Sequence, residues 1–418
     1  MNNQTELLSP AGDEHKLRLA LEYGADAVYA GVSHFSLRIR STKTFTYESF
    51  QESIDYTHSK GKKLYATING FPFNAQIKLL ENHIARIAEY KPDAFIVASP
   101  GVIRLCNRIA PQIPIHVSTQ ANVLSYMDAE VYADMGVKRI VAAREVSLKD
   151  LIKIKEHLPH IELEVFVHGS MCFAYSGRCL LSSVQSGRVS NRGSCANDCR
   201  FPYTMYAKNE DSGVLFRLEE DEMGTHIFNS KDLNMIHHVK DMLDSNVISA
   251  FKVEGRTKSP YYVAATTHAY RDALDGYYND NFNEKKYADE LNTLKNRGFT
   301  DGYIINRPYE KNDTQNHLTS MGAGTTDVHA LITEDEEYFL SKGKVMPGLD
   351  YEIMSPKSSA PTEVDNEIGT IKLIDGTYFV NFKKIETQNG KTLEAVHSGN
   401  TNPCKLPDKL PKFSFLRR

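Results

Sequence analysis

Long apolar runs and targeting signals are missing from this chain of 418 residues. No stretch approaches the roughly 20 consecutive apolar residues that a membrane-spanning helix needs. The first residues lack a basic segment followed by an apolar one, which argues against a secretory signal peptide. We therefore expect a cytoplasmic protein with no membrane partner. In that compartment thiols stay reduced, and clustered cysteines serve metal binding or catalysis more often than disulfides.

Several catalytic and binding motifs are also absent. The sequence has no His-Glu-x-x-His zinc motif, no Gly-x-Ser-x-Gly nucleophile motif, no phosphate-binding loop and no Cys-x-x-Cys pair. The first apolar run is followed by Ala11 and Gly12 rather than by the Gly-x-Gly-x-x-Gly turn of dinucleotide-binding sheets. These absences argue against the common hydrolase classes and weaken the case for a doubly wound α/β sheet, which is the alternative fold.

Charge is distributed unevenly along the chain. The formal net charge of −4 excludes a chain that is basic throughout. The last residues, 405–418, nevertheless carry five Lys or Arg against one Asp, with Phe413 and Phe415 between them. Such a segment is either an ordinary solvated terminus or a local nucleic-acid-binding patch.

The first 255 residues alternate between short apolar runs and amphipathic helical patterns. The apolar runs resemble strands of a parallel sheet that is buried on both faces. Eight such runs with helical patterns between them predict a (β/α)8 barrel of the TIM type. The predicted strands are Glu6–Ser9, Asp26–Ala30, Lys63–Ile68, Ala94–Ala98, Ile113–Val117, Arg139–Ala142, Glu162–Val167 and Ala250–Val253.

The pattern changes near residue 320. Short alternating runs separated by Gly, Pro, Asn and Asp turns predict a small all-β barrel domain over 319–418, which ends in the basic tail. The TIM-like barrel would then occupy residues 1–318. It would carry an insertion, 169–249, between its seventh and eighth strands.

Polar residues follow most of the predicted strands. In a barrel the carboxyl ends of the strands meet at one rim, where such enzymes place their chemistry. We therefore expect functional side chains among Ser9, Gly31, Asn69, Ser99, Ser118, Gln120, Arg144, Glu145, His168, Glu254 and Arg256.

Arginines at this rim are candidates for binding an anionic substrate. Arg38 and Arg40 follow the second strand, Arg144 the sixth and Arg256 the eighth. A guanidinium group binds carboxylate or phosphate through paired hydrogen bonds, although ordinary surface ion pairs are the alternative. Charged residues alternate from Lys252 to Arg256 at the end of a buried strand. Burying charges is costly unless they are paired or used, which favours a functional role.

Four of the six cysteines lie within 28 residues, inside the predicted insertion. Four thiolates complete the coordination sphere of zinc or of an iron–sulfur cluster. Structural zinc sites usually show two Cys-x2–4-Cys pairs, and only the second pair here fits that spacing. The spacing favours a cluster but leaves zinc and four unrelated cysteines open. The four are Cys172, Cys179, Cys195 and Cys199, with spacings Cys-x6-Cys, fifteen residues and Cys-x3-Cys.

Two segments around the first of these cysteines, Glu164–Cys172 and Gly177–Ser182, resemble the signature of the collagenase-like peptidase family, peptidase family U32. The resemblance covers nearly the whole chain, including the small β domain. It extends through Leu7–Gly12, Gly24–Gly31, Ser118–Asn122, Asn229–Leu233 and Lys252–Arg256.

The resemblance implies more than one activity. The family was named for collagen-degrading members, whereas other members hydroxylate tRNA, ribosomal RNA or ubiquinone precursors without oxygen. Those members hold a [4Fe–4S] cluster on four cysteines and use prephenate as the apparent hydroxyl source. Segment order and length are most similar to members that convert the wobble uridine of tRNA to 5-hydroxyuridine. The stretch between Cys199 and Asn229 is shorter than in some relatives, so RNA contacts made there are not implied.

By this resemblance the four clustered cysteines are the cluster ligands, prephenate is the co-substrate, and the anticodon arm of tRNA is a partner; the electron donor is unknown. We hypothesise that Arg38 and Arg40, with Arg144 and Arg256, bind the carboxylates of a small dicarboxylate donor. Glu254 or His168 would move protons. The β domain and the basic tail would hold the anticodon arm. The alternatives are a collagenase-like peptidase and an RNA-binding module with structural Zn2+.

Overall fold

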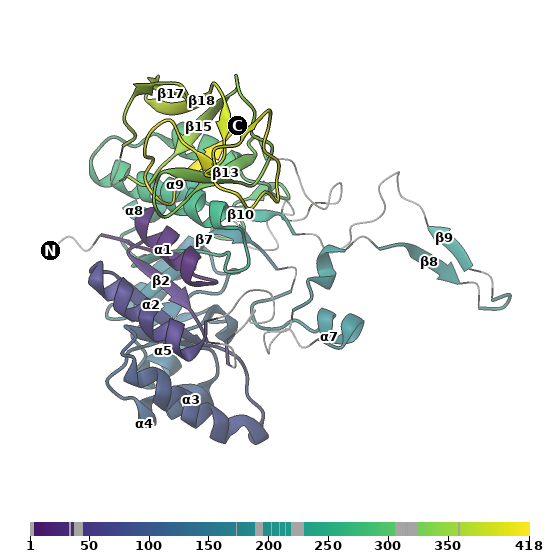
Figure 1. The fold of residues 1–418 in the computed structure, drawn as a ribbon. Coiled ribbons are helices and arrows are strands. Elements are labelled where there is room, and N and C mark those ends of the chain that lie inside the picture. The colour runs from purple at the N-terminus through teal and green to yellow at the C-terminus, as the bar shows by residue number, and fades with distance from the viewer. Residues whose placement is uncertain are drawn as a thin grey trace.

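The computed structural model consists of a barrel, a β unit packed against it and an arm that extends away from both (Figure 1). Among the described residues, no helix is long and apolar enough to cross a bilayer. The structure describes residues 4–32, 35–36, 45–172, 174–188, 195–201, 203–208, 210–213, 215–218, 230–305, 314, 316, 324–357 and 360–418.

Eight parallel strands form the barrel. They follow the order β11-β1-β2-β3-β4-β5-β6-β7, and the barrel closes because β7 also pairs with β11. The predicted (β/α)8 barrel is therefore confirmed, and no strand end differs from its predicted position by more than three residues. The strands are β1 (Glu6–Pro10), β2 (Ala27–Ala30), β3 (Lys63–Ile68), β4 (Ala94–Val97), β5 (Ile115–Val117), β6 (Arg139–Val141), β7 (Glu162–Ser170) and β11 (Ala250–Val253).

Helices cover the outside of the barrel, and several of them begin at a capping side chain. Asp13, Thr46, Ser125, Ser147 and Ser259 each accept a hydrogen bond from a backbone N–H of the first turn of the helix that follows. The helices are α1 (Glu14–Glu22), α2 (Tyr47–Ser59), α3 (Ile77–Glu89), α4 (Pro100–Ile109), α5 (Tyr126–Asp134), α6 (Leu148–His157), α8 (Val239–Asp244), α9 (Pro260–Tyr278) and α10 (Glu284–Asn292).

The chain between β7 and β11 leaves the barrel and returns to it. It contains the short helix α7 (Leu181–Ser186) and a hairpin of β8 (Met205–Lys208) and β9 (Leu215–Leu218), which forms the arm (Figure 1). The chain returns as β10 (Asp232–Asn234), which pairs antiparallel with the end of β7, and β12 (Phe299–Thr300) pairs with β10. The segment that carries the cysteines therefore leaves the barrel after β7 and is held against β7 again where it returns as β10.

The second unit is an eight-stranded antiparallel half-barrel with its own apolar core, which agrees with the predicted all-β domain. Its first strand begins at Val328, and the predicted limits 1–318 and 319–418 stay a prediction. The strands follow the order β16 (Val364–Asp365), β17 (Gly369–Ile374), β18 (Thr377–Phe382), β15 (Asp350–Met354), β22 (Phe415–Arg417), β13 (Val328–Ile332), β14 (Tyr338–Ser341) and β21 (Cys404–Lys405), and a separate pair is β19 (Ile385–Glu386) with β20 (Thr392–Leu393).

The basic tail is not a free segment, which does not support its predicted role in holding RNA. Strand β22 lies inside the sheet between β13 and β15 and buries Phe415, and Phe413 before it packs into the barrel core. The hydroxyl of Tyr23, directly after α1, lies 3.0 Å from the carbonyl oxygens of both Met354 and Phe413. The tail therefore joins the two units, and β22 has no free edge at which a partner could pair.

Arg417 is buried at this junction. Its guanidinium lies 2.6 Å from Glu290 of α10 and 2.5 Å from Glu352 of β15. Replacing Arg417 with alanine is expected to lower the free energy of unfolding by about 3 kcal/mol, because two largely buried carboxylates would lose their cation. Urea unfolding followed by circular dichroism measures this. The exposed neighbour Arg418, changed to alanine, is the matched control, and equal midpoints for the two variants would contradict the prediction.

Candidate active site

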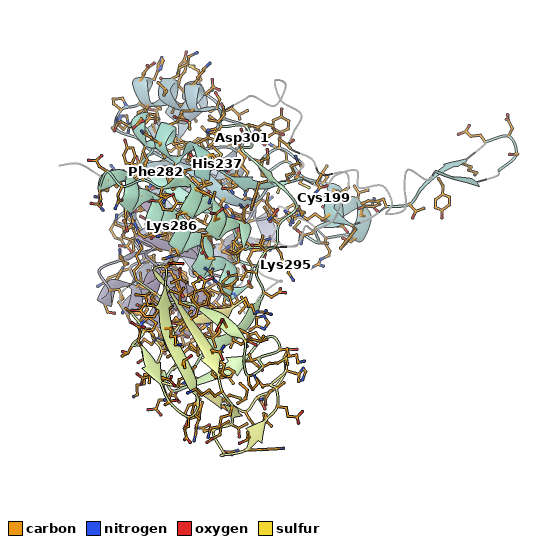
Figure 2. The ribbon with its side chains drawn as sticks, turned by 90° about the horizontal axis from the view of Figure 1, so that it is seen from above. Cys199, His237, Phe282, Lys286, Lys295 and Asp301 are labelled. Carbon is orange, nitrogen blue, oxygen red and sulfur yellow. The ribbon has the colours of Figure 1, made fainter. Side chains whose placement is uncertain are left out.

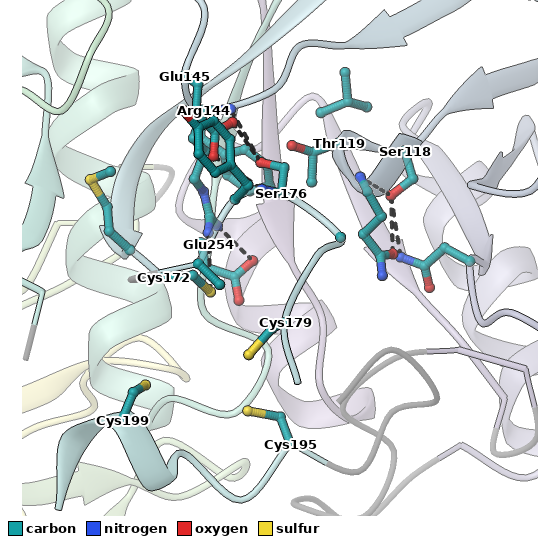
Figure 3. A pocket seen from close by; sticks show the side chains of 18 of the residues that line it. Ser118, Thr119, Arg144, Glu145, Cys172, Ser176, Cys179, Cys195, Cys199 and Glu254 are labelled. Carbon is teal, nitrogen blue, oxygen red and sulfur yellow. Dashed lines mark hydrogen bonds and ion pairs between the residues drawn. The ribbon is translucent and has the colours of Figure 1, made fainter. Parts of the chain in front are cut away.

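A cavity of about 520 Å3 opens at the carboxyl ends of the barrel strands, under the cysteine-bearing segment (Figure 3). Among the polar strand-end residues expected at the rim, Ser9, Gly31, Ser99 and His168 do not line this cavity. Those that do line it are Asn69, Ser118, Gln120, Arg144, Glu145, Glu254 and Arg256.

The structure brings all four clustered cysteines to this one cavity, where their thiols are free (Figure 3). Cys172 directly follows β7, Cys179 precedes α7, and Cys195 and Cys199 lie on the next loop. The other two cysteines lie elsewhere: Cys106 in the barrel core and Cys404 in the core of the β unit. Burial raises the pKa of the Cys106 thiol to about 12, so it stays protonated and inert.

The loop that carries Cys172 and Cys179 is fixed to the barrel. Glu145, after β6, accepts hydrogen bonds from the backbone N–H and the hydroxyl of Ser176, both at 3.0 Å. Gly177 has a φ of +73° and lies so close to the carbonyl of Gln120 that a Cβ would meet its oxygen at 2.2 Å. Only glycine fits that position without strain. The first two thiols are therefore held over the rim by side-chain and backbone contacts.

The second half of the cysteine segment is tied to the first half. The Ser182 hydroxyl accepts a hydrogen bond of 3.2 Å from the backbone N–H of Ala196, next to Cys195. Ser186, at the end of α7, donates to the buried carboxylate of Asp198 at 3.2 Å. These contacts bring residues from two separate stretches of chain to the same wall of the cavity.

Electrostatic interactions show that the thiols lie near one another. Burial raises the pKa of the Cys199 thiol, and the guanidinium of the neighbouring Arg200 acts in the opposite direction. The thiols of the other three clustered cysteines raise the pKa of Cys199 further, because one thiolate disfavours a second one nearby. A bound cation would relieve this repulsion, and thiolates are the form that binds metals.

The donor set fits a thiolate-ligated cluster. Within the described part of the chain, no three His, Cys, Asp or Glu side chains converge closely enough to hold one ion. In a single-zinc site with Zn–S bonds of about 2.3 Å the sulfurs stand about 3.8 Å apart. A four-iron cluster is larger than one ion, so its four ligands stand further apart around it. Four free thiols that line one cavity could therefore hold a four-iron cluster.

Arg144 lies beside Cys172 and Glu254, which follow the neighbouring strands β7 and β11 (Figure 3). One terminal nitrogen lies 3.8 Å from the sulfur of Cys172, and the other lies 4.0 Å from a carboxylate oxygen of Glu254. The guanidinium lies over the ring of Phe166 at 4.4 Å. Its Nε is buried and has no hydrogen-bond partner among the described residues. Arg144 lines the cavity, and within the described part of the chain its two terminal nitrogens make only these long contacts with Cys172 and Glu254, so they could bind an anionic group there.

Lys252 and Arg256 provide two more cations. The Lys252 ammonium is buried 2.7 Å from Glu164 and lies over the ring of Tyr29 at 4.3 Å. Burial lowers the pKa of Lys252, while the Glu164 carboxylate acts to raise it. Arg256 donates to the Ser36 hydroxyl at 2.8 Å. The positions therefore suit an anion with two charged ends.

His168 lies outside the cavity, which does not support its predicted role in moving protons. It is buried among the rings of Tyr262, Tyr270 and Phe299. Burial lowers the pKa of His168 to about 4, so the imidazole is neutral near pH 7. Glu254 does line the cavity, and its role in moving protons stays a hypothesis. Arg38 and Arg40 lie outside the described residues.

The low pKa of His168 predicts a pH dependence of stability. The unfolded chain takes up a proton at His168 below about pH 6.5 and the folded chain only near pH 4, so stability falls as the pH drops through this window. The His168→Gln variant should lose about 3 kcal/mol less than the native protein between pH 7 and pH 4. Urea unfolding at several pH values measures the difference. His160→Gln, on the surface, is the control; parallel curves for His168→Gln and the native protein would contradict the prediction.

Some cavity residues escaped the sequence analysis. Tyr29 reads as an ordinary apolar strand residue, yet it lines the cavity and donates a hydrogen bond of 2.9 Å to the carbonyl of Val253. Residues two apart in a strand point to the same side, so Tyr29 shares a face of β2 with Ala27. This was the one sequence signal that Tyr29 faces the barrel interior. Tyr303 and Tyr175 also line the cavity from loops that carry no motif.

Comparisons with known proteins agree with the resemblance noted in the sequence. The model of peptidase family U32 matches residues 12–314. The tRNA hydroxylation protein P of Helicobacter pylori is 59% identical over 416 residues, covering 99% of both chains. The Escherichia coli protein of that name is 36% identical and covers 85% of this chain and 87% of its own. A collagenase of Porphyromonas gingivalis is 32% identical over 72% of this chain and 74% of its own. The chain therefore belongs to peptidase family U32.

Proposed function

We propose that this enzyme hydroxylates the wobble uridine of tRNA to 5-hydroxyuridine, independently of oxygen, with prephenate as the hydroxyl source and a [4Fe–4S] cluster as cofactor. The observation that carries the proposal is the meeting of four free thiols and four Lys or Arg side chains at one cavity. Relatives named for tRNA hydroxylation, similar over almost the whole chain, support the choice of substrate. A cytoplasmic location, where tRNA is found and thiols stay reduced, is part of the proposal.

The clustered cysteines would hold the cofactor. When bound, the cluster would supply electron-transfer chemistry. Turning a C–H bond of the pyrimidine into C–OH removes one proton and two electrons from the base, so prephenate or an external electron acceptor would have to take up those two electrons. The guanidinium groups of Arg144, 3.8 Å from the sulfur of Cys172, and of Arg200, beside Cys199, would offset part of the negative charge of the ligands. The loop contacts between Ser176 and Glu145 would keep the ligands in place during turnover.

The cations of the cavity would bind the hydroxyl donor. Prephenate carries two carboxylates, and Arg144, Lys252 and Arg256 line the cavity where such an anion would lie. Arg144 is the strongest candidate because, among the described residues, its terminal nitrogens make only long contacts of 3.8 and 4.0 Å, whereas Lys252 and Arg256 make contacts of 2.7 and 2.8 Å with protein groups. A charge-assisted hydrogen bond to a carboxylate there would be short and directional. The uridine would then enter from the open side, above the donor.

The peptidase alternative has less support from the cavity. A cysteine or serine nucleophile needs an adjacent base, most often histidine. Within the described part of the chain, no histidine lines the cavity, and the group next to Cys172 is Arg144. A collagenase among the relatives does not supply the missing base.

The proposal is tested by expressing the chain in a bacterial strain that lacks its own tRNA uridine hydroxylation. Mass spectrometry of the tRNA nucleosides should then detect 5-hydroxyuridine or its derivatives, and an empty vector gives the baseline. Removing prephenate synthesis from the strain should abolish the product. If expression of the folded protein leaves the nucleosides unchanged, the proposed substrate is wrong.

A further inference from the structure

We infer that the cysteine-bearing segment is itself the RNA-docking surface, and that Tyr175 stacks on a base of a single-stranded loop at the cavity mouth. The inference rests on the proposed function and assigns the surface by which that same site receives its substrate. It also replaces the basic tail as the RNA contact, because Phe413, Phe415 and Arg417 are buried in the protein.

The first observation is a set of large apolar side chains that the segment leaves in solvent, here called the apolar rim. The rim consists of Tyr175, Leu180, Val184 and Phe201, with exposed fractions of 56%, 69%, 79% and 53%. All but Phe201 line the cavity. Leu180, which precedes α7, and Val184 within it are four residues apart and so lie on the same side of that helix. A contiguous exposed apolar patch beside a cavity is typical of a binding surface.

The second observation is local charge. The described residues 174–188 and 195–201 carry three arginines and one aspartate, a net of +2, in a chain whose total is −4. Arg178 and Arg188 are exposed, whereas Asp198 is buried and bonded to Ser186. The segment therefore offers solvent an apolar surface with positive charge and no exposed carboxylate among these residues. This combination suits single-stranded RNA, whose bases stack on aromatic rings while its phosphates pair with arginine.

The third observation is that Tyr175 is presented by a fixed loop. The residue next to it, Ser176, is held by both carboxylate oxygens of Glu145 at 3.0 Å. A base that stacks on this ring would therefore not have to order the loop first, which favours affinity. A cavity of about 520 Å3 has room for a base beside the donor.

The position of the segment agrees with this role. Cys199 lies at the base of the arm (Figure 2), and the arm and the β unit leave the barrel on different sides in both views. The β unit therefore does not cover the apolar rim. RNA that lies along the segment would place one base over the thiols.

The test measures binding of a fluorescent anticodon stem-loop RNA to the anaerobically purified protein by anisotropy. The Tyr175→Ala variant should bind about tenfold more weakly, and Tyr175→Phe should bind like the native protein, because a phenyl ring still stacks. The double variant Arg178→Gln, Arg188→Gln should reduce the slope of log K against log salt by about 0.7 for each phosphate that the protein no longer neutralises. Iron content and the melting temperature show that each variant is intact.

Matched controls come from exposed residues on the barrel helices. Met127→Ala removes an equally exposed apolar side chain from α5, and Lys285→Gln removes an exposed cation from α10; neither should alter binding. If the native protein binds the RNA and the Tyr175 and arginine variants bind it equally well, the docking surface is wrong while the proposed function stands. If the native protein binds a denatured-collagen peptide and not the RNA, both are overturned.

Discussion

Replacing any one of the four cavity cysteines with serine is expected to abolish both iron binding and tRNA hydroxylation. A serine hydroxyl stays protonated at neutral pH and is a poor ligand, so the cluster would lose one of its four attachments. Anaerobically purified native protein should be brown, with about four irons and broad absorbance near 400 nm. The serine variants should be colourless or bind much less iron, and nucleoside mass spectrometry should find no product. The four positions are Cys172, Cys179, Cys195 and Cys199.

The chain supplies its own controls for this experiment. Cys106 and Cys404 lie in the two apolar cores, away from the cavity. Their alanine variants should keep full iron content, apart from a modest loss of stability. A colourless native protein with one zinc would contradict the cluster, and serine variants that keep iron and activity would contradict the ligand assignment.

Replacing Arg144 with glutamine is expected to lower kcat/KM for prephenate about 10- to 100-fold. A hydrogen bond between charged groups contributes roughly 1.5–3 kcal/mol, and the partly buried guanidinium lines the cavity. It lies 3.8 Å from the sulfur of Cys172 and 4.0 Å from the carboxylate of Glu254, next to the first of the thiols. Because the thiol ligands are untouched, iron content should stay the same. Steady-state kinetics at several prephenate concentrations measure the effect.

The Arg144→Lys variant separates charge from shape. Lysine keeps the positive charge but loses the planar pair of donors, so it should recover part of the loss. Arg86→Gln on α3, which removes an exposed arginine paired with Glu48 at 3.0 Å, is the matched control. An unchanged KM for prephenate in Arg144→Gln, with kcat alone reduced, would show that this arginine does not bind the donor.

The barrel was predictable because each strand carries its own signal. Runs such as Ala94–Val97 and Ala250–Val253 are apolar throughout or nearly so, and a strand that is buried on both faces needs that pattern whatever its neighbours are. Each helix-capping side chain likewise accepts a hydrogen bond from the first turn of its own helix, so it too depends only on nearby sequence. The half-barrel could be foreseen from short alternating runs for the same local reason.

The tail and His168 show where local reasoning was insufficient. Five cations and two phenylalanines close together suggest a nucleic-acid patch, but β22 is a central strand, and Arg417 pairs with Glu290 and Glu352 from distant segments. His168 stands at a strand end, yet it faces the aromatic shell and not the cavity. In both cases the surroundings come from parts of the chain that no short pattern reveals.

The sequence by itself determined the strands and the four thiols, because each depends on residues a few positions apart. Only the tertiary structure decided what those thiols face. Closing the barrel sets Arg256 against Ser36 and Tyr29 against Val253, pairs more than 200 positions apart. Contacts over such distances are made by the geometry of the closed sheet, which places the ends of all eight strands around one rim. The cations, the tyrosines and the apolar rim that surround the thiols follow from that closure.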